Sequence, residues 1–177
     1  RKKAVEELSR LAGDIHEGLT GGEERLTIEY RRHGGEEVAE TLLSWYNKAL
    51  RESAASDIRR GSTSVGPHLD DLLLRVNGAE LRAYGSQGQQ RTGVLSLKLA
   101  ELEFLRAATG EYPVLLLDDV MSELDRGRRE ELLSFLQRDH IQTFITATDA
   151  AYFPAGIHGA VFHVECGRVR RMAAEMG

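Results

Sequence analysis

Residues 114–125 read VLLLDDVMSELD, an apolar run that passes directly into two adjacent carboxylates and a short acidic turn. A continuous apolar run after Pro113 predicts a strand covered on both faces, as in a parallel sheet. An aspartate at the carboxyl end of such a strand lies where α/β sheets bind ligands. Asp118 can hold Mg²⁺ through its water shell, and Asp119 can orient an attacking water. A solvated strand end is the alternative interpretation.

Upstream of this strand, residues 85–91 read GSQGQQR and precede a predicted helix at 89–108. Free backbone N–H groups and the Ser86 hydroxyl at the positive end of a helix dipole can cradle a phosphate. A plain turn with a helix cap is the alternative. The helix is apolar nearly all round in its middle, which predicts deep burial.

Downstream, a helix around residues 132–136 and a strand at 144–146 follow the first strand through short links. Strand, helix and strand in this order indicate an α/β sheet. Residues 160–165 and 168–172 predict a final hairpin around Gly167.

The N-terminal part has a different pattern. Apolar spacing predicts helices at 4–19 and around 38–49, with a strand at 26–30 between them. The polar stretch 51–64 is interpreted as a connection, with a lobe boundary near residue 62. Strands at 72–76 and 80–84 flank Asn77-Gly78, a strong hairpin turn signal.

Composition limits the class of protein. The 177 residues carry a net charge of −5, 41% hydrophobic side chains and a single cysteine, Cys166. No apolar stretch is long enough to span a bilayer, and no signal peptide pattern is present. We therefore expect a cytoplasmic protein with no membrane partner. Because the first residue is Arg1, we expect a chain cut from something longer.

The three motifs occur in the order of an ABC ATPase: signature loop, Walker B strand and D-loop. Within that class the chain resembles the RecF family, which has similar segments at 66–72 (GPHLDDL), 86–92 (SQGQQRT), 97–101 (LKLAE) and 115–125. The resemblance covers about residues 57–149. It implies an α/β fold, namely the C-terminal half of an ABC-ATPase head with a parallel sheet core and flanking helices. Residues 1–62 would be part of helical lobe II, and 63–177 part of the ATPase lobe.

The resemblance also implies a role for each motif residue. Asp118 would hold Mg²⁺ with ATP, and Asp119 would be the catalytic base. A signature loop would contact the nucleotide bound by a second subunit, a D-loop would follow Walker B, and Thr148 would take the switch position. The loop residues are Ser86, Gln87, Gly88 and Gln89; the D-loop residues are Ser122 and Asp125; possible supporting residues are His68 and Arg91.

Several departures from the family pattern are visible. Leu69 replaces the usual arginine, and Thr148 stands where transporter subunits have a titratable histidine. No G-x-x-x-x-G-K-[ST] loop is present, so we expect the chain alone to be inactive. His68 can also be read as a histidine that satisfies backbone groups near Asp70. The histidines and Cys166 lack metal-ligand spacing, so no site made only of protein ligands is predicted.

By resemblance, the function is that of an ATP-dependent DNA-binding recombination mediator, with a weak DNA-dependent ATPase. Such a protein forms an ATP-dependent homodimer at single-strand/double-strand gaps and works with RecO and RecR to load RecA in repair, replication restart and the SOS response. The alternative is a non-catalytic DNA- or mediator-binding module. Basic clusters such as 31–32 and 59–60 are either solvated surface or phosphate contacts. A coiled-coil arm of the SMC type does not fit residues 4–50.

Overall fold

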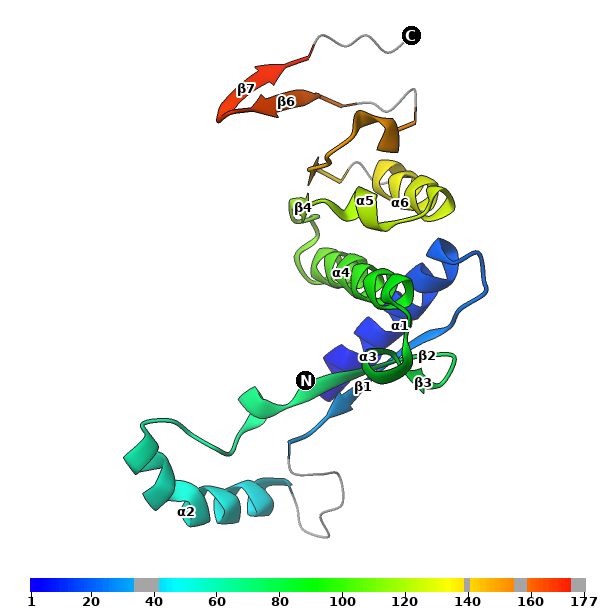
Figure 1. The fold of residues 1–177 in the computed structure, drawn as a ribbon. Coiled ribbons are helices and arrows are strands. Elements are labelled where there is room, and N and C mark those ends of the chain that lie inside the picture. The colour runs from blue at the N-terminus through cyan, green and yellow to red at the C-terminus, as the bar shows by residue number, and fades with distance from the viewer. Residues whose placement is uncertain (34–41, 139–140, 155–158, 173–177) are drawn as a thin grey trace. The chain divides into compact units, whose positions relative to one another are not determined.

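The computed structural model describes residues 1–33, 42–138, 141–154 and 159–172, and divides into two compact units at Pro113 (Figure 1). The first unit holds α1 (Lys2–Leu19), β1 (Leu26–Arg31), α2 (Leu42–Arg60), η1 (Pro67–Leu69), β2 (Asp71–Val76), β3 (Ala79–Glu80), α3 (Leu81–Tyr84) and α4 (Gln87–Thr109). The second holds β4 (Leu115–Leu117), α5 (Val120–Glu123), α6 (Arg126–Arg138), β5 (Thr143–Ile145), η2 (Ala150–Tyr152), β6 (Phe162–Glu165) and β7 (Arg168–Arg171). The helix, strand and hairpin pattern of an α/β protein is confirmed.

The first unit is built on an antiparallel sheet in the order β1-β2-β3, with Leu26 opposite Val76 in the register. Asn77 and Gly78 both have positive φ, as a two-residue type I′ hairpin turn requires. The Asn77 side chain also accepts a hydrogen bond from the N–H of Arg25 at 2.9 Å. The turn therefore fixes the hairpin and the start of β1 together.

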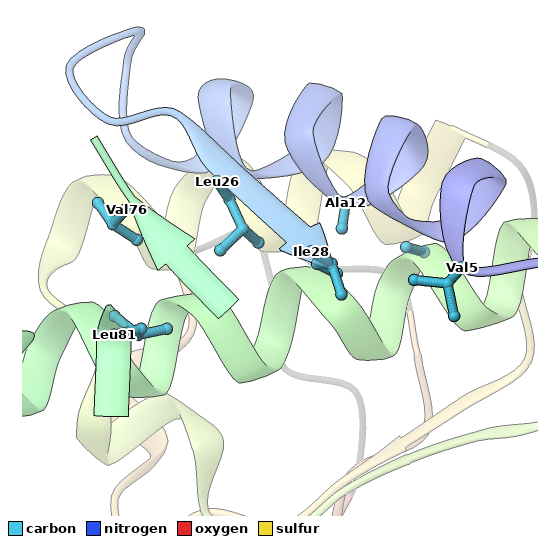
Figure 2. Close-up of a cluster of buried hydrophobic side chains, with 7 residues drawn as sticks. Val5, Ala12, Leu26, Ile28, Val76 and Leu81 are labelled. Atoms are coloured by element: carbon cyan, nitrogen blue, oxygen red, sulfur yellow. The ribbon is translucent and has the colours of Figure 1, made fainter. Parts of the chain in front are cut away.

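The core of this unit lies between the sheet and helices α1 and α4 (Figure 2). Ala12 and Ala100 are both fully buried, and small side chains let the two helices approach closely. The cluster consists of Val5, Ala12, Leu26, Ile28, Val76, Leu81 and Ala100.

Three local predictions for this unit are wrong. The polar segment after residue 50 continues α2 to Arg60, because good helix formers propagate a helix without a buried face, and α2 buries none of its described side chains. The return strand ends at Glu80, where the chain turns into the short helix α3. Helix α4 is buried on one face only, since Val94 on the other face is 61% exposed. Val38, part of the second predicted helix, lies outside the described residues.

The predicted lobe boundary near residue 62 stays a prediction. Strand β1 pairs with β2, and α1 packs on α4, so segments on both sides of residue 62 share one sheet and one core. Along the sequence, the first compact unit ends at Pro113 and the second begins at Val114.

In the second unit, β4 and β5 form the predicted parallel pair, with Leu115 opposite Thr143. Leu115 and Leu117 are buried, but Leu116 is 70% exposed. We expected β4 to be covered on both faces, and this is wrong: the described residues cover only the face that carries Leu115 and Leu117. Strands β6 and β7 form the predicted terminal hairpin. None of the described helices is long and apolar enough to cross a membrane.

Candidate functional site

The predicted signature loop ends at a capped helix terminus in the first unit. Ser86 is the N-cap of the 23-residue helix α4. Its Oγ accepts the N–H of Gln89 at 3.2 Å, and the Gln89 Oε1 accepts the N–H of Ser86 at 3.0 Å. This reciprocal pair is a capping box, so the helix-cap interpretation describes the geometry of the loop.

The capped loop keeps the groups that a phosphate would need. An N-cap serine uses an oxygen lone pair for the cap, and its own hydroxyl proton stays available for donation. The N–H groups of Gln87 and Gly88, in the first turn of α4, have no acceptor within the helix. Ser86 and Gln87 are exposed, while Gly88 and Gln89 are half-buried. A helix cap and a phosphate cradle are therefore compatible at this loop.

Gly85 and Gly93 hold this loop close to the core. A Cβ added to Gly85 would lie 2.5 Å from the carbonyl oxygen of Leu81. A Cβ added to Gly93 would lie 2.5 Å from Leu81 Cδ2. A side chain at position 85 would clash with backbone, whereas one at position 93 would require the end of Leu81 to shift. Gln90 adds a bond from its side-chain amide to the Gly85 carbonyl at 3.1 Å. The loop is thus packed onto Leu81 from two sides.

The paired carboxylates lie in the second unit, at the end of β4. Asp118 and Asp119 are both exposed, and Asp119 has a left-handed backbone with φ 50°. Thr146, which follows β5, joins them. Its hydroxyl donates to Asp118 Oδ1 at 2.5 Å and accepts the N–H of Asp119 at 2.9 Å. The ends of two neighbouring parallel strands are therefore tied together by one threonine.

Thr146 is a site residue that the sequence interpretation missed. A hydroxyl at the carboxyl end of the strand next to the Asp118 strand is a usable signal, because parallel strand ends meet at one edge. Two residues further on, Thr148, which the resemblance puts in the switch position, is exposed in a bend three residues after β5.

The D-loop side chains make local bonds that shape the segment after Asp119. The Ser122 hydroxyl donates to the Asp119 carbonyl at 2.9 Å. Asp125 Oδ1 accepts the N–H of Arg128 at 3.0 Å, which caps the start of α6. Arg129 Nε donates to the Met121 carbonyl at 2.7 Å, so α6 is fastened to the helical turn α5.

The two possible supporting residues differ in their surroundings. His68 is exposed, and its Nε2 lies 3.1 Å from the Thr63 carbonyl. Beside it, Asp70 accepts bonds from the Tyr30 hydroxyl and from the N–H of His33. Burial raises the pKa of Asp70, but the bonds from Tyr30 and His33, together with nearby arginine charges, hold that pKa below its ordinary value. Arg91 is exposed on α4. The GPHLDDL segment is thus fastened to β1 through Asp70.

Within the described ranges, no group of three or more His, Cys, Asp or Glu side chains could hold a metal ion. Mg²⁺ bound with ATP does not need such a group, because it keeps several waters and takes one or two carboxylates together with phosphate oxygens. The exposed Asp118, oriented by Thr146, offers the hard oxygen ligand that this mode of binding uses.

Comparisons with known proteins identify relatives of the chain. No protein-family model matches the chain. It is similar to curated proteins named "DNA replication and repair protein RecF" from three bacteria, among others. Identity is 45% to that of Citrifermentans bemidjiense, covering 84% of this chain and 41% of the relative. It is 47% to that of Halothermothrix orenii (84% and 40%) and 42% to that of Heliobacterium modesticaldum (97% and 47%). The chain thus spans less than half the length of these relatives.

Solved structures give the same result. The chain superposes on the recombination mediator protein RecF with ATPγS at a TM-score of 0.71 and 38% identity, covering 97% of this chain and 45% of that one. RecF with ATP gives a TM-score of 0.71 at 36% identity, with the same coverage. A structure from work on SMC ATPases, at 14% identity and a TM-score of 0.56, shares the fold.

Proposed function

The chain belongs to the RecF family, and on that premise we propose that it forms part of an ATP-gated, DNA-binding recombination mediator. The observation that supports this proposal is the presence of two features in the same chain. One is a capped helix N-terminus at Ser86 with unsatisfied N–H groups, and the other is a carboxylate pair at Asp118 and Asp119 clamped by Thr146. By resemblance, both would belong to the family's ATP-dependent machinery.

The first step assigned to this chain is metal binding. Asp118 would hold Mg²⁺ through its water shell, with Thr146 fixing the carboxylate. When bound, Mg²⁺ supplies neutralising charge to the phosphates of ATP. Asp119 would orient the attacking water and accept its proton. The left-handed backbone at Asp119 turns the chain sharply after β4, and Thr146 secures this turn by accepting its N–H.

The second step is recognition of nucleotide by the loop 86–89. The Ser86 hydroxyl and the N–H groups of Gln87 and Gly88 would contact the γ-phosphate of ATP held by a second subunit. A two-fold dimer with two such contacts would be closed by ATP and released by hydrolysis. We assign this dimer to gapped DNA at single-strand/double-strand junctions, with RecO and RecR as partners in loading RecA.

Ser86→Arg in a full-length RecF-family protein that carries this sequence tests the assignment. An arginine at the N-cap would fill the space for the γ-phosphate while leaving the subunit's own nucleotide site intact. ATP binding should therefore stay near wild type, and ATP-dependent dimerisation measured by sedimentation should be lost. Normal dimerisation of this variant would contradict the role of the loop.

DNA binding separates this function from its rival. The full-length protein should bind gapped DNA more tightly with ATP than without, and binding should weaken as salt rises. Equal binding with and without nucleotide, at the same salt concentration, would favour the non-catalytic DNA- or mediator-binding module instead.

A further inference from the structure

His16, in α1, is fully buried and lies against α4. Its Nδ1 is 3.0 Å from Ser96 Oγ, and that hydroxyl donates its single proton to the Thr92 carbonyl at 2.7 Å. The Ser96 oxygen therefore accepts a hydrogen bond from His16, and His16 Nδ1 carries the hydrogen of that bond. The other ring nitrogen, Nε2, points to a different partner.

That partner is Glu24, in the loop between α1 and β1. Glu24 Oε2 lies 3.2 Å from His16 Nε2, and the Glu24 side chain is only 15% exposed. His16 already donates its Nδ1–H to Ser96. An imidazolium donates from both ring nitrogens, so in that form of His16 the contact from Nε2 to Glu24 is also a hydrogen bond. Thr20 steadies the loop by donating to the His16 carbonyl at 2.8 Å.

The second oxygen of Glu24 reaches the candidate nucleotide loop. Glu24 Oε1 accepts from Gln89 Nε2 at 3.0 Å, although the two residues are 65 positions apart. A carboxylate only accepts, so it requires the NH₂ side of the Gln89 amide. The oxygen of that amide is thereby turned to the N–H of Ser86, where it forms one arm of the capping box.

We propose that Glu24, held by buried His16, is a positioning residue for the loop 86–89. It selects the orientation of the Gln89 amide that closes the capping box and so presents Ser86 and the first N–H groups of α4 to a ligand. The ligand, the nucleotide of a second subunit, rests on the proposed function; the positioning itself does not. The Gln89 amide consequently serves to hold the loop, since its oxygen bonds the Ser86 N–H and its NH₂ group bonds Glu24.

The chemistry makes the carboxylate hard to replace. Glu24 uses two oxygens, one for His16 and one for Gln89, and both must accept. A glutamine at position 24 could still accept from Gln89 and donate its NH₂ to Nε2 of a neutral His16, so it would not separate the two contacts. A leucine at position 24 accepts from neither partner. The Gln89 amide can then turn over and present NH₂ to the Ser86 N–H, which opens the box. The neighbouring Glu23 is exposed and offers a matched control for the loss of one negative charge.

Hydrogen exchange followed by mass spectrometry tests this in a full-length RecF-family protein carrying the sequence, without nucleotide. In Glu24→Leu, amides in the peptide covering 85–91 should exchange about tenfold faster, as expected for loss of a charge-assisted bond. Glu23→Leu should match wild type. Equal exchange in all three proteins would overturn the proposal.

A role swap gives a second test that does not depend on one variant folding well. Gln89→Glu alone places two carboxylates against each other and should also speed exchange at 85–91. The double variant Glu24→Gln/Gln89→Glu should return it to near wild type. Its amide at position 24 can accept from His16 and donate to the carboxylate at position 89, which still caps Ser86. A double variant no better than Gln89→Glu would overturn the proposal.

A functional readout keeps the two hypotheses apart. Glu24→Leu should raise the ATP concentration needed for half-maximal dimerisation several-fold, with Glu23→Leu unchanged. Normal ATP-dependent dimers in Ser86→Arg would refute the proposed function, whereas the exchange results decide whether Glu24 positions the loop. Unchanged dimerisation in Glu24→Leu, with Ser86→Arg unable to dimerise, would show that this positioning does not serve nucleotide binding.

Discussion

The contact between Gly93 and Leu81 provides a stability test of how the candidate loop is mounted. Leu81 is 4% exposed, and a Cβ at Gly93 would lie 2.5 Å from Leu81 Cδ2. Overpacking of this kind destabilises a protein by about 1–3 kcal/mol. Replacing a helical glycine by alanine stabilises the helix by about 1 kcal/mol, which offsets part of that loss. We expect Gly93→Ala to lower the free energy of unfolding by about 1 kcal/mol.

The sign of that effect should reverse when Leu81 is truncated. Leu81→Ala alone removes a buried side chain and should cost about 3 kcal/mol. After this truncation, the methyl group added at position 93 keeps only an ordinary contact with Leu26 Cδ1 at 3.8 Å, so Gly93→Ala should now stabilise by about 1 kcal/mol. The coupling between the two changes is then about 2 kcal/mol, which is measurable by a double-mutant cycle.

Two further glycines serve as controls in the same urea titrations, followed by far-UV circular dichroism. Gly85→Ala meets the carbonyl of Leu81, so Leu81→Ala should not rescue it. Gly18→Ala, in α1 with open space around it, should be neutral or slightly stabilising. If Gly93→Ala is equally destabilising with either residue at position 81, the packing of α3 on α4 described above is wrong.

The remaining predictions concern the second unit, the acid response and the chain alone. Thr146→Val should reduce ATP turnover of the full-length protein about tenfold, since a bond to a charged group is lost, and Thr146→Ser should restore it; turnover equal to wild type in the valine variant would count against the clamp. Burial raises the pKa of Asp70, but the bonds from Tyr30 and His33 and nearby arginine charges hold it below its ordinary value. The stabilising effect of Asp70 is therefore present above about pH 4 and is lost as pH falls further. Tyr30→Phe should raise the pKa of Asp70, so the urea midpoint should fall less between pH 5 and pH 2 than in the wild type; an unchanged fall in the urea midpoint would refute the assignment. The 177-residue chain alone, which has no G-x-x-x-x-G-K-[ST] loop, should hydrolyse ATP at background rate, and robust turnover would contradict this.

Local chemistry explains why much of the fold was predictable. The Asn77-Gly78 turn, the parallel β4 and β5 pair and the terminal hairpin each follow from short patterns, since turn residues and apolar runs act over a few positions. The extent of α2 and the exposure of Leu116 were not predictable in this way. Burial depends on what packs against an element, and that information is not local.

The candidate site shows the same division. The Asp118 and Ser86 motifs are visible as short runs, and the capping box could be inferred from Ser86 and Gln89 at their three-residue spacing. Thr146 and Glu24 could not be assigned so directly. Each reaches its partner across the fold, over 28 positions from Thr146 to Asp118 and 65 from Glu24 to Gln89.

Subunit mixing tests the central claim most directly, namely that loop 86–89 acts on nucleotide bound by another subunit's Asp118 and Asp119. Full-length Ser86→Ala and Asp119→Asn should each be inactive as homodimers in DNA-stimulated ATP turnover. A mixed dimer contains one site with an intact loop and an intact carboxylate pair, so equal mixing should recover about a quarter of wild-type turnover. No recovery at any mixing ratio, with mixed dimers confirmed by sedimentation, would contradict the account.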